Sequence, residues 1–308
     1  MMKKSNVKNS FYLFSAALIW GTAFVFQSMG NEYMEPFTFF ASRSFLGFLV
    51  LIPFAIIKLK RQSYNADNNN KIPIKFTLVG GLCCGIALTV ASLFQQYGMK
   101  YTTVGKAGFI TALYIIITPI LGIFIRKKCP FTVWIGAVVA VVGMYFLCVT
   151  ESFIISIGDI LVLICAVVFS VQILAVDYFS PKTDGVILSC IQFFVCFIIS
   201  SVLALIFDKP IISQIFDGII PVLYAGIMSS GVAYTFQILG QKNFNPTAAA
   251  MILSLEAVIS TVAGYIAYNL GFLTQDQSLT SFQIAGCIIV FCAVIFVQIP
   301  IDKLKRHK

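Results

Sequence analysis

The feature that most constrains this chain is a series of apolar stretches, each about long enough to cross a membrane. A helix that spans the hydrocarbon core of a bilayer needs about 20 apolar residues, and such stretches recur along all 308 residues with short loops between them. No stretch shows the period-two alternation of a transmembrane β-strand. The sequence therefore predicts an all-α, polytopic membrane protein with ten transmembrane helices. The predicted spans cover residues 11–30, 36–57, 76–98, 105–125, 131–149, 158–179, 186–207, 219–239, 247–270 and 280–300.

Composition leads to the same conclusion by excluding soluble classes of protein. Hydrophobic residues make up 59% of the chain and charged residues only 11%. A soluble domain with so little charge would have too few buried positions for its apolar residues. The loops are too short to contain a folded domain. The first stretch follows Lys3, Lys4 and Lys8 and is longer than the apolar region of a signal peptide, so we expect a retained helix.

The distribution of Lys and Arg predicts the orientation of these helices. With ten spans, 17 of the 21 basic residues fall on the side that holds both termini and 3 fall on the other side, while Arg43 lies within the second span. Basic residues are enriched in the cytoplasmic loops of membrane proteins. We therefore expect a multi-pass protein of the cytoplasmic membrane with both termini in the cytoplasm. This explains the formal net charge of +9, so no nucleic-acid partner is expected.

Neither a metal site nor a cofactor is expected. The nine cysteines lie mostly within apolar stretches, their number is odd and they lack paired CxxC spacing. They are therefore interpreted as small packing residues. The single histidine, His307, lies in the C-terminal tail, which excludes a histidine relay for protons within the membrane. The sequence contains neither an HExxH motif nor a phosphate-binding Gly-Lys motif.

An internal duplication divides the chain into two halves. Residues 98–122 align with residues 240–264 at a constant offset of 142, and the matching positions include glycines and polar residues, which this composition makes scarce. We predict two repeats of five helices each, over residues 1–150 and 151–308. The matched pairs are Gly98 with Gly240, Gln95 with Gln237, Tyr114 with Glu256, and, at an offset of 149, Trp20 with Phe169 and Arg43 with Gln192.

An odd number of helices in each repeat has a geometric consequence. The second copy crosses the membrane in the opposite direction, so the halves are related by a pseudo-twofold axis in the bilayer plane. Inverted repeats of this kind are common in secondary transporters, whose substrate site lies near the midplane between the halves. Two nearly equivalent halves can exchange conformations, so that a central site opens first to one side and then to the other.

Short motifs along the chain occur in an order that is similar to a known transporter family. They are Trp20-Gly21-Thr22-Ala23-Phe24 in the first span, Pro36, Phe39 and Arg43 in the second, Gly98–Thr103 before the fourth, and Leu255-Glu256 in the ninth. This pattern resembles the EamA-like branch of the drug/metabolite transporter superfamily over essentially the whole chain. Ala257 stands where the family usually has proline after the Leu-Glu pair, and this departure leaves the substrate open.

The resemblance implies a ten-helix carrier of small organic solutes, such as amino acids or amphipathic metabolites, lined chiefly by helices one, three, four, six, eight and nine. The leading hypothesis is a secondary transporter that moves such solutes across the cytoplasmic membrane by alternating access, and not an enzyme. The alternative is a membrane-embedded enzyme or a channel acting on lipid-soluble substrates, which would need a catalytic pair, a metal cluster or a ring of charges. The expected partners are a small-molecule substrate and the lipid bilayer, with the carrier acting as a monomer or a weak dimer.

Two charged residues are expected deep in the bilayer, Arg43 in the second span and Glu256 in the ninth. A charge at the bilayer centre costs at least about 2.5–3.5 kcal/mol on insertion scales, so each one requires an explanation. One alternative is a structural ion pair between the two side chains. Another makes Glu256 a proton-coupling site or a site for a substrate ammonium group. The sequence leaves these alternatives open.

The uncharged candidates for a substrate site form two groups. Amide and hydroxyl side chains within the spans are expected to face the interior, because an amide in contact with lipid is costly, and there they bond other helices or contact the substrate. Aromatic side chains either pack or line a pocket for amphipathic or aromatic solutes, including cations. The first group contains Gln27, Gln95, Thr111, Gln172 and Gln237, and the second contains Trp20, Phe24, Tyr114 and Tyr234.

Overall fold

The computed structural model describes residues 4–64, 74–126, 131–148 and 156–298, and within these residues every regular element is a helix. The part of the chain described in this way contains 8 helices that are long and apolar enough to cross a membrane. Two shorter apolar helices cover Trp134–Gly143 and Ser281–Ala293. The prediction of an all-helical, polytopic membrane fold is confirmed.

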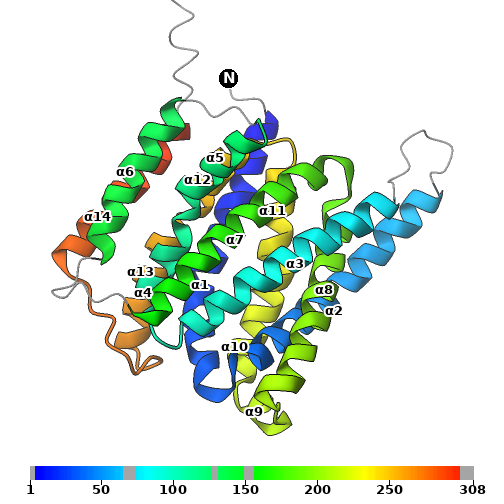
Figure 1. Cartoon of the computed structure of the whole chain (residues 1–308), viewed down its shortest axis with the longest axis horizontal. Coiled ribbons are helices and arrows are strands. Elements are labelled where there is room, and N and C mark those ends of the chain that lie inside the picture. The colour runs from blue at the N-terminus through cyan, green and yellow to red at the C-terminus, as the bar shows by residue number, and fades with distance from the viewer. Residues whose placement is uncertain (1–3, 65–73, 127–130, 149–155, 299–308) are drawn as a thin grey trace, which may run out of the picture.

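The described residues of the first half of the chain form six helices (Figure 1). Pro36 is the first residue of the second helix, a position where its fixed φ favours the helix and its missing N–H leaves no bond unmade. The Thr103 side chain accepts a hydrogen bond from the Lys106 N–H and so caps the start of the fourth helix. These helices are α1 (Lys4–Tyr33), α2 (Pro36–Tyr64), α3 (Ile74–Gly98), α4 (Val104–Ala112), α5 (Tyr114–Phe124) and α6 (Phe131–Cys148).

The second half begins with a capping box, in which Ser156 and Asp159 satisfy each other's backbone N–H groups. It contains two π-helices, η2 (Ala204–Asp208) and η3 (Tyr224–Ala233), and one 3-10 turn, η1 (Ser180–Lys182). The α-helices are α7 (Ile157–Phe179), α8 (Gly185–Leu203), α9 (Ile212–Asp217), α10 (Ile219–Leu223), α11 (Tyr234–Gln241), α12 (Pro246–Leu253), α13 (Glu256–Asn269) and α14 (Ser281–Gln298).

Two spans that were predicted as continuous helices are divided near their middle. The span over 105–125 separates into α4 and α5 at Leu113, whose N–H bonds to the Ile110 carbonyl at 3.2 Å. The span over 247–270 separates into α12 and α13 just before Glu256, where the Leu255 N–H bonds to the Ile252 carbonyl at 3.3 Å. In both places the helix tightens locally to i→i+3 bonds. Hydropathy alone did not predict these breaks, because both sides of each break are equally apolar.

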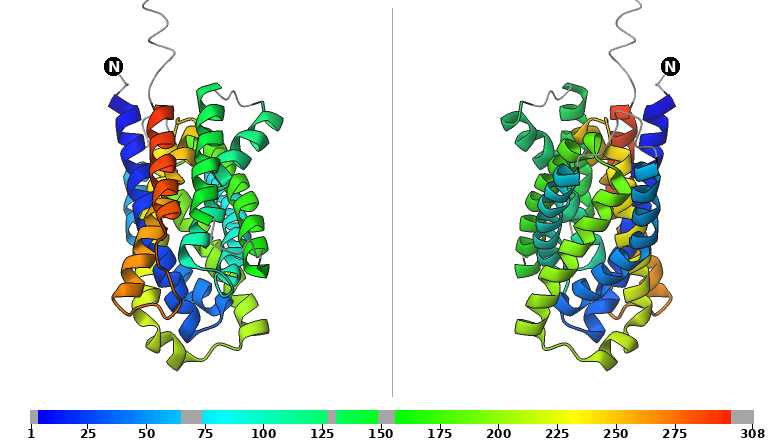
Figure 2. Two further views of the ribbon diagram at one scale, coloured as in Figure 1. Left: turned by 90° about the vertical axis from the view of Figure 1, so that its left-hand side faces the viewer. Right: turned by 90° about the vertical axis from the view of Figure 1, so that its right-hand side faces the viewer.

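The helices pack as one bundle around a core of apolar side chains. Helix α6 packs against α14 at one edge and α2 against α8 at the opposite edge, while α3 packs against α7 and α4 against α13 (Figure 1). The start of α1 and the end of α14 lie at the same end of the bundle (Figure 2). The largest apolar cluster includes Leu13, Phe40, Leu88, Ile173, Phe193 and Leu253.

Glycines allow the backbones of two helix pairs to approach closely. A Cβ atom added at Gly98 of α3 would lie 2.5 Å from Val162 Cγ2 and 2.8 Å from the carbonyl oxygen of Gly158, both on α7. One added at Gly240 of α11 would lie 2.8 Å from Leu13 Cγ and 3.0 Å from the carbonyl oxygen of Asn9, both on α1. Small residues at such crossings are the usual way in which membrane helices achieve tight packing.

Replacement of Gly98 with alanine is expected to destabilise the fold. The added methyl group would meet Val162 and the Gly158 carbonyl, and overpacking of this kind typically costs about 1–3 kcal/mol. Purified protein in detergent should therefore unfold at a lower temperature. Gly231→Ala is the matched control, because the nearest atom to an added Cβ there, Val50 Cγ1, is 3.4 Å away. Equal unfolding temperatures for the two variants would contradict the close approach of α3 and α7.

Candidate functional site

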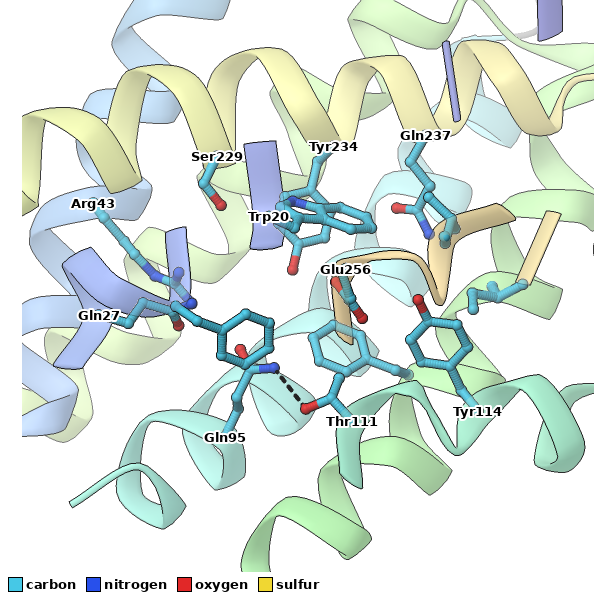
Figure 3. A pocket seen from close by; sticks show the side chains of 14 residues that line it. Trp20, Gln27, Arg43, Gln95, Thr111, Tyr114, Ser229, Tyr234, Gln237 and Glu256 are labelled. Carbon is cyan, nitrogen blue, oxygen red and sulfur yellow. Dashed lines mark hydrogen bonds between the residues drawn. The ribbon is translucent and has the colours of Figure 1, made fainter. Parts of the chain in front are cut away.

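A cavity in the middle of the bundle is lined by most of the polar side chains that the sequence predicts as candidates for a substrate site. Its free volume is about 20 Å³, so the lining side chains lie close together in this conformation. All of the sequence candidates except Gln172 line it (Figure 3). The lining residues are Trp20, Phe24, Gln27, Arg43, Gln95, Thr111, Tyr114, Phe169, Ile173, Ser229, Tyr234, Gln237, Leu253 and Glu256.

Four lining residues were not among the sequence candidates: Phe169, Ile173, Ser229 and Leu253. Three of them occupy positions that the duplication relates to sequence candidates in the other half of the chain. Trp20 corresponds to Phe169 and Phe24 to Ile173 at an offset of 149, and Thr111 corresponds to Leu253 at an offset of 142. Ser229 lies on η3, and apart from the small size of its side chain no sequence feature pointed to it. The repeat offsets therefore relate three apolar lining residues to polar or aromatic ones in the other half.

Arg43 is buried in α2 with only 2% of its surface exposed. Its guanidinium carbon lies 4.8 Å from the centre of the Phe40 ring and 5.9 Å from that of Phe39. Aromatic faces attract such a cation, but they provide no hydrogen-bond acceptor in the plane of the guanidinium. The Arg43 Nε atom has no hydrogen-bond partner among the described residues.

Glu256 is the first residue of α13, 3% exposed, and its side chain points into the cavity (Figure 3). Backbone N–H groups at this helix start are paired across the break, with Ala257 bonding the Ser254 carbonyl and Ile259 the Leu255 carbonyl, both at 3.1 Å. The Tyr114 hydroxyl lies toward the same part of the cavity (Figure 3). Neither Glu256 Oε1 nor the Tyr114 hydroxyl has a hydrogen-bond partner within the described residues.

Arg43 and Glu256 do not form an ion pair with each other. The salt bridges found between described residues join Lys58 to Asp184, Lys100 to Glu35 and Lys106 to Asp159. The structural ion pair that the sequence left open is therefore not present in this conformation. Both charges face the same cavity (Figure 3).

Amide side chains form part of the wall. Gln95 Nε2 donates to Thr111 Oγ1 at 3.1 Å, which joins α3 to α4 (Figure 3). Gln237 Nε2 donates to Gln172 Oε1 at 3.0 Å, and Gln172 Nε2 lies 3.4 Å from both Gln237 Oε1 and Gln192 Oε1. Gln172 thus supports Gln237 from behind and does not itself line the cavity. The Gln27 Oε1 atom is buried without a partner.

Aromatic rings make up the apolar part of the wall. The rings of Trp20 and Tyr234 lie 4.5 Å apart at an angle of 55°, and Phe193 meets the Tyr234 ring edge-on at 5.4 Å. The Trp20 Nε1 atom is buried without a hydrogen-bond acceptor among the described side chains and backbone groups. The cavity therefore combines ring faces with several polar atoms that the protein does not satisfy.

Polar contacts between helices lie on either side of the cavity, toward the two ends of the bundle. Near the start of α4, Lys106 Nζ lies 2.6 Å from Asp159 Oδ2, and Thr102 Oγ1 donates to Asp159 Oδ1 at 2.8 Å. Just after α11, Asn9 Nδ2 donates to the Lys242 carbonyl at 2.9 Å, and Lys242 Nζ donates to the Thr183 carbonyl at 3.2 Å. The lining side chains other than Trp20 are buried, so this conformation encloses the cavity.

Removal of the hydroxyl in the Gln95–Thr111 pair is expected to destabilise the protein. Thr111→Val removes the hydroxyl that accepts from Gln95 Nε2 and leaves this buried amide without a partner. Such a loss typically lowers the free energy of unfolding by about 1–3 kcal/mol. Adding Gln95→Met removes the orphaned amide, so the double variant should recover part of that loss. Thermal unfolding of the wild type, both single variants and the double variant measures the coupling. Strictly additive shifts would contradict a direct bond between the two side chains.

Known proteins resemble this chain over most of its length. The model of the EamA-like transporter family matches residues 8–149 and again residues 156–299. An uncharacterized transporter of Archaeoglobus fulgidus is 30% identical over 289 residues, covering 92% of this chain and 84% of the relative. An uncharacterized transporter of Bacillus subtilis is 23% identical over 294 residues, covering 94% of this chain and 96% of the relative.

The fold also has a counterpart among solved structures. One crystal structure of a protein superposes with a TM-score of 0.71 at 18% sequence identity, over 96% of this chain and 98% of the other. At this level of identity the likeness concerns the fold alone. The family match confirms the resemblance that the sequence motifs indicated.

Proposed function

Because the chain belongs to the EamA-like transporter family, we propose that it is a secondary carrier that moves small organic solutes across the cytoplasmic membrane by alternating access. The observation that carries this proposal is the enclosed cavity with its unsatisfied polar atoms. A buried polar group without a partner costs about 1–3 kcal/mol, and a bound solute can supply the missing partners. The atoms concerned are Trp20 Nε1, Gln27 Oε1, Arg43 Nε, the Tyr114 hydroxyl and Glu256 Oε1.

The carrier has ten transmembrane helices arranged as two inverted repeats, residues 1–150 and 151–308. The close helix crossings support this arrangement. An offset of 142 relates Gly98 to Gly240. An offset of 149 relates Asn9 to Gly158 and Leu13 to Val162. These are the residues that the two glycines meet on α1 and α7. The crossing of α3 with α7 thus has its counterpart in the crossing of α11 with α1.

The helix breaks support a site at the midplane. Tyr114 and Glu256, which the offset of 142 relates, are the first residues after the breaks in the two divided spans. Secondary transporters commonly form their substrate sites from discontinuous helices whose half-helix ends face the ligand.

Both termini lie in the cytoplasm. The described chain starts and ends at one end of the bundle (Figure 2), which fits an even number of spans. The charge asymmetry of 17 basic residues against 3 supports a position of that end inside the cell. The polar contacts around Asp159 then close the outer path and those around Lys242 close the inner path, so transport requires each set to open in turn.

Trp20→Ala is expected to change which solutes the carrier accepts. The Trp20 ring forms a face of the cavity against Tyr234, so its removal enlarges the site and takes away a surface for apolar or cationic groups. Uptake of a panel of labelled amino acids and amines into proteoliposomes measures the preference. Trp134→Ala, which changes the tryptophan on α6 outside the lining residues, is the control. An unchanged uptake profile for Trp20→Ala would remove this ring from the substrate site.

Glu256→Gln is expected to abolish transport driven by a proton gradient while leaving expression and folding intact. Glu256 is the carboxylate among the lining residues, and glutamine keeps its size but does not exchange a proton. Uptake into proteoliposomes with an imposed pH gradient tests this, with gel filtration as the check on folding. Glu35→Gln, at the exposed partner of Lys100, should retain gradient-driven uptake. Full gradient-driven uptake by Glu256→Gln would exclude proton coupling through this residue.

A further inference from the structure

A second hollow, larger than the central cavity, lies between α2 and α8. Its free volume is about 310 Å³. It shares no lining residue with the central cavity, and adjacent residues of α2 separate the two, since Ser42 lines this hollow and Arg43 lines the cavity. We call it the α2–α8 groove. Its walls come from residues within 38–45 and 197–205, with Pro210 and Ile215 beyond them.

Small side chains create the groove and a pair of aromatic rings closes it at one end. Ala41 of α2 and Ala204 of η2 are buried lining residues, so they leave space where longer side chains would fill the helix crossing. Phe45 and Phe197 are the lining residues farthest from the start of α2 and from the end of α8, and their rings lie 4.9 Å apart. The groove is therefore closed toward the middle of the two helices.

The groove is continuous with the lipid-facing surface of the protein. The helices on either side of it are long and apolar enough to cross a membrane. Phe45 and Leu205, which line it, and their neighbours Val202 and Ile206 are exposed apolar side chains. Within a bilayer such side chains meet hydrocarbon, so lipid has direct access to the groove.

The chemistry of the lining favours an apolar occupant. None of the lining residues is charged. The Ser42 hydroxyl donates to the Thr38 carbonyl at 2.8 Å, and the Thr38 hydroxyl donates to Asp208 Oδ2 at 3.0 Å. Water needs two to four polar partners to occupy a hollow, whereas an apolar chain gains contacts with every wall. An acyl chain is the apolar ligand that the surrounding membrane supplies.

A basic residue lies beside the open end of the groove. Lys209 directly precedes the lining residue Pro210, is exposed, and has a left-handed φ of 53°. The other two basic residues expected at this end of the bundle, Lys100 and Lys106, form salt bridges. Lys209 forms none with the described residues. The phosphate of a phospholipid has the charge that complements it.

We propose that the α2–α8 groove binds one acyl chain of a phospholipid whose phosphate contacts Lys209. In the orientation proposed above, this lipid belongs to the outer leaflet. The site goes beyond the proposed transport function, because it lies outside the central cavity and is independent of the solute that is carried.

The test uses two probes that differ in the phosphate group. They are 1-palmitoyl-2-oleoyl-phosphatidylglycerol and 1-palmitoyl-2-oleoyl-glycerol. Each is titrated against the purified full-length protein in detergent, where a ligand that binds the folded protein raises its unfolding temperature. Native mass spectrometry counts the phospholipids that remain bound to each protein.

Ser201→Phe is designed to fill the groove from α8. Val202→Phe is the matched control, since it adds the same ring at the next position, which is exposed and does not line the groove. Ser201→Phe should retain one phospholipid fewer than Val202→Phe and gain a smaller rise in unfolding temperature. Ala41→Leu, which fills the groove from α2, should give the same result and replaces Ser201→Phe if that variant aggregates.

Lys209→Gln tests the phosphate contact. It should bind phosphatidylglycerol about fivefold more weakly, because a lysine near the membrane surface contributes roughly this factor to the affinity for an anionic lipid. Its affinity for the diacylglycerol should be unchanged. Lys100→Gln, at a cation already paired with Glu35, is the control and should bind both probes as the wild type does.

The wild-type protein provides a test that needs no variant. In nanodiscs, phosphatidylglycerol with a photoreactive diazirine at the end of one chain should label residues near Phe45 and Phe197, where the groove is closed. Absence of label there overturns the proposal. So do equal lipid counts and equal temperature shifts for Ser201→Phe and Val202→Phe, and so does a dimer lost in Ser201→Phe without loss of lipid, which would assign the groove to a second copy of the chain. Equal affinity of the wild type and Lys209→Gln for phosphatidylglycerol overturns the phosphate contact.

Discussion

Lipid hydrocarbon supplies no hydrogen-bond partner, and this constraint determines where the polar groups of this chain are placed. A polar side chain within a span must be satisfied by the protein or face a cavity. The amides of Gln95, Gln172 and Gln237 show the first solution, since each bonds a side chain on a neighbouring helix. Arg43 and Glu256 show the second, since both face the central cavity and neither pairs with the other.

Close helix packing and helix breaks make that cavity possible. Gly98 and Gly240 allow α3 and α11 to lie directly against α7 and α1, which holds the bundle together without occupying its centre. The breaks after Leu113 and before Glu256 place two helix starts inside the bundle. In the proposed carrier, the tight crossings would act as fixed contacts, and the ion pair of Lys106 with Asp159 as a contact that must open. A protein with this arrangement would change conformation by breaking a few polar contacts at its ends while its core stays packed.

Much of the site could be predicted because scarce residues are informative in an apolar chain. Glutamine, arginine and glutamate are costly within a membrane, so their presence in predicted spans identified candidates that the structure gathers around one cavity. Gln172 was the exception: an inward-facing amide either bonds another helix or contacts a solute, and the sequence does not distinguish the two. Phe169, Ile173 and Leu253 were missed because apolar residues are so common here that only the repeat offsets separate them from ordinary packing residues.

The sequence by itself determined that this is a polytopic helical membrane protein, because the length and spacing of apolar stretches depend only on the thickness of the bilayer. Its short motifs resembled the EamA-like family, and the family match confirmed that resemblance. It also determined which side chains are too polar to face lipid. Only the tertiary structure decided that Arg43 and Glu256 stay unpaired, that two spans are divided and that Gln172 lies behind the cavity wall. These features depend on distances between helices far apart in the chain, and hydropathy along a single helix contains no information about them.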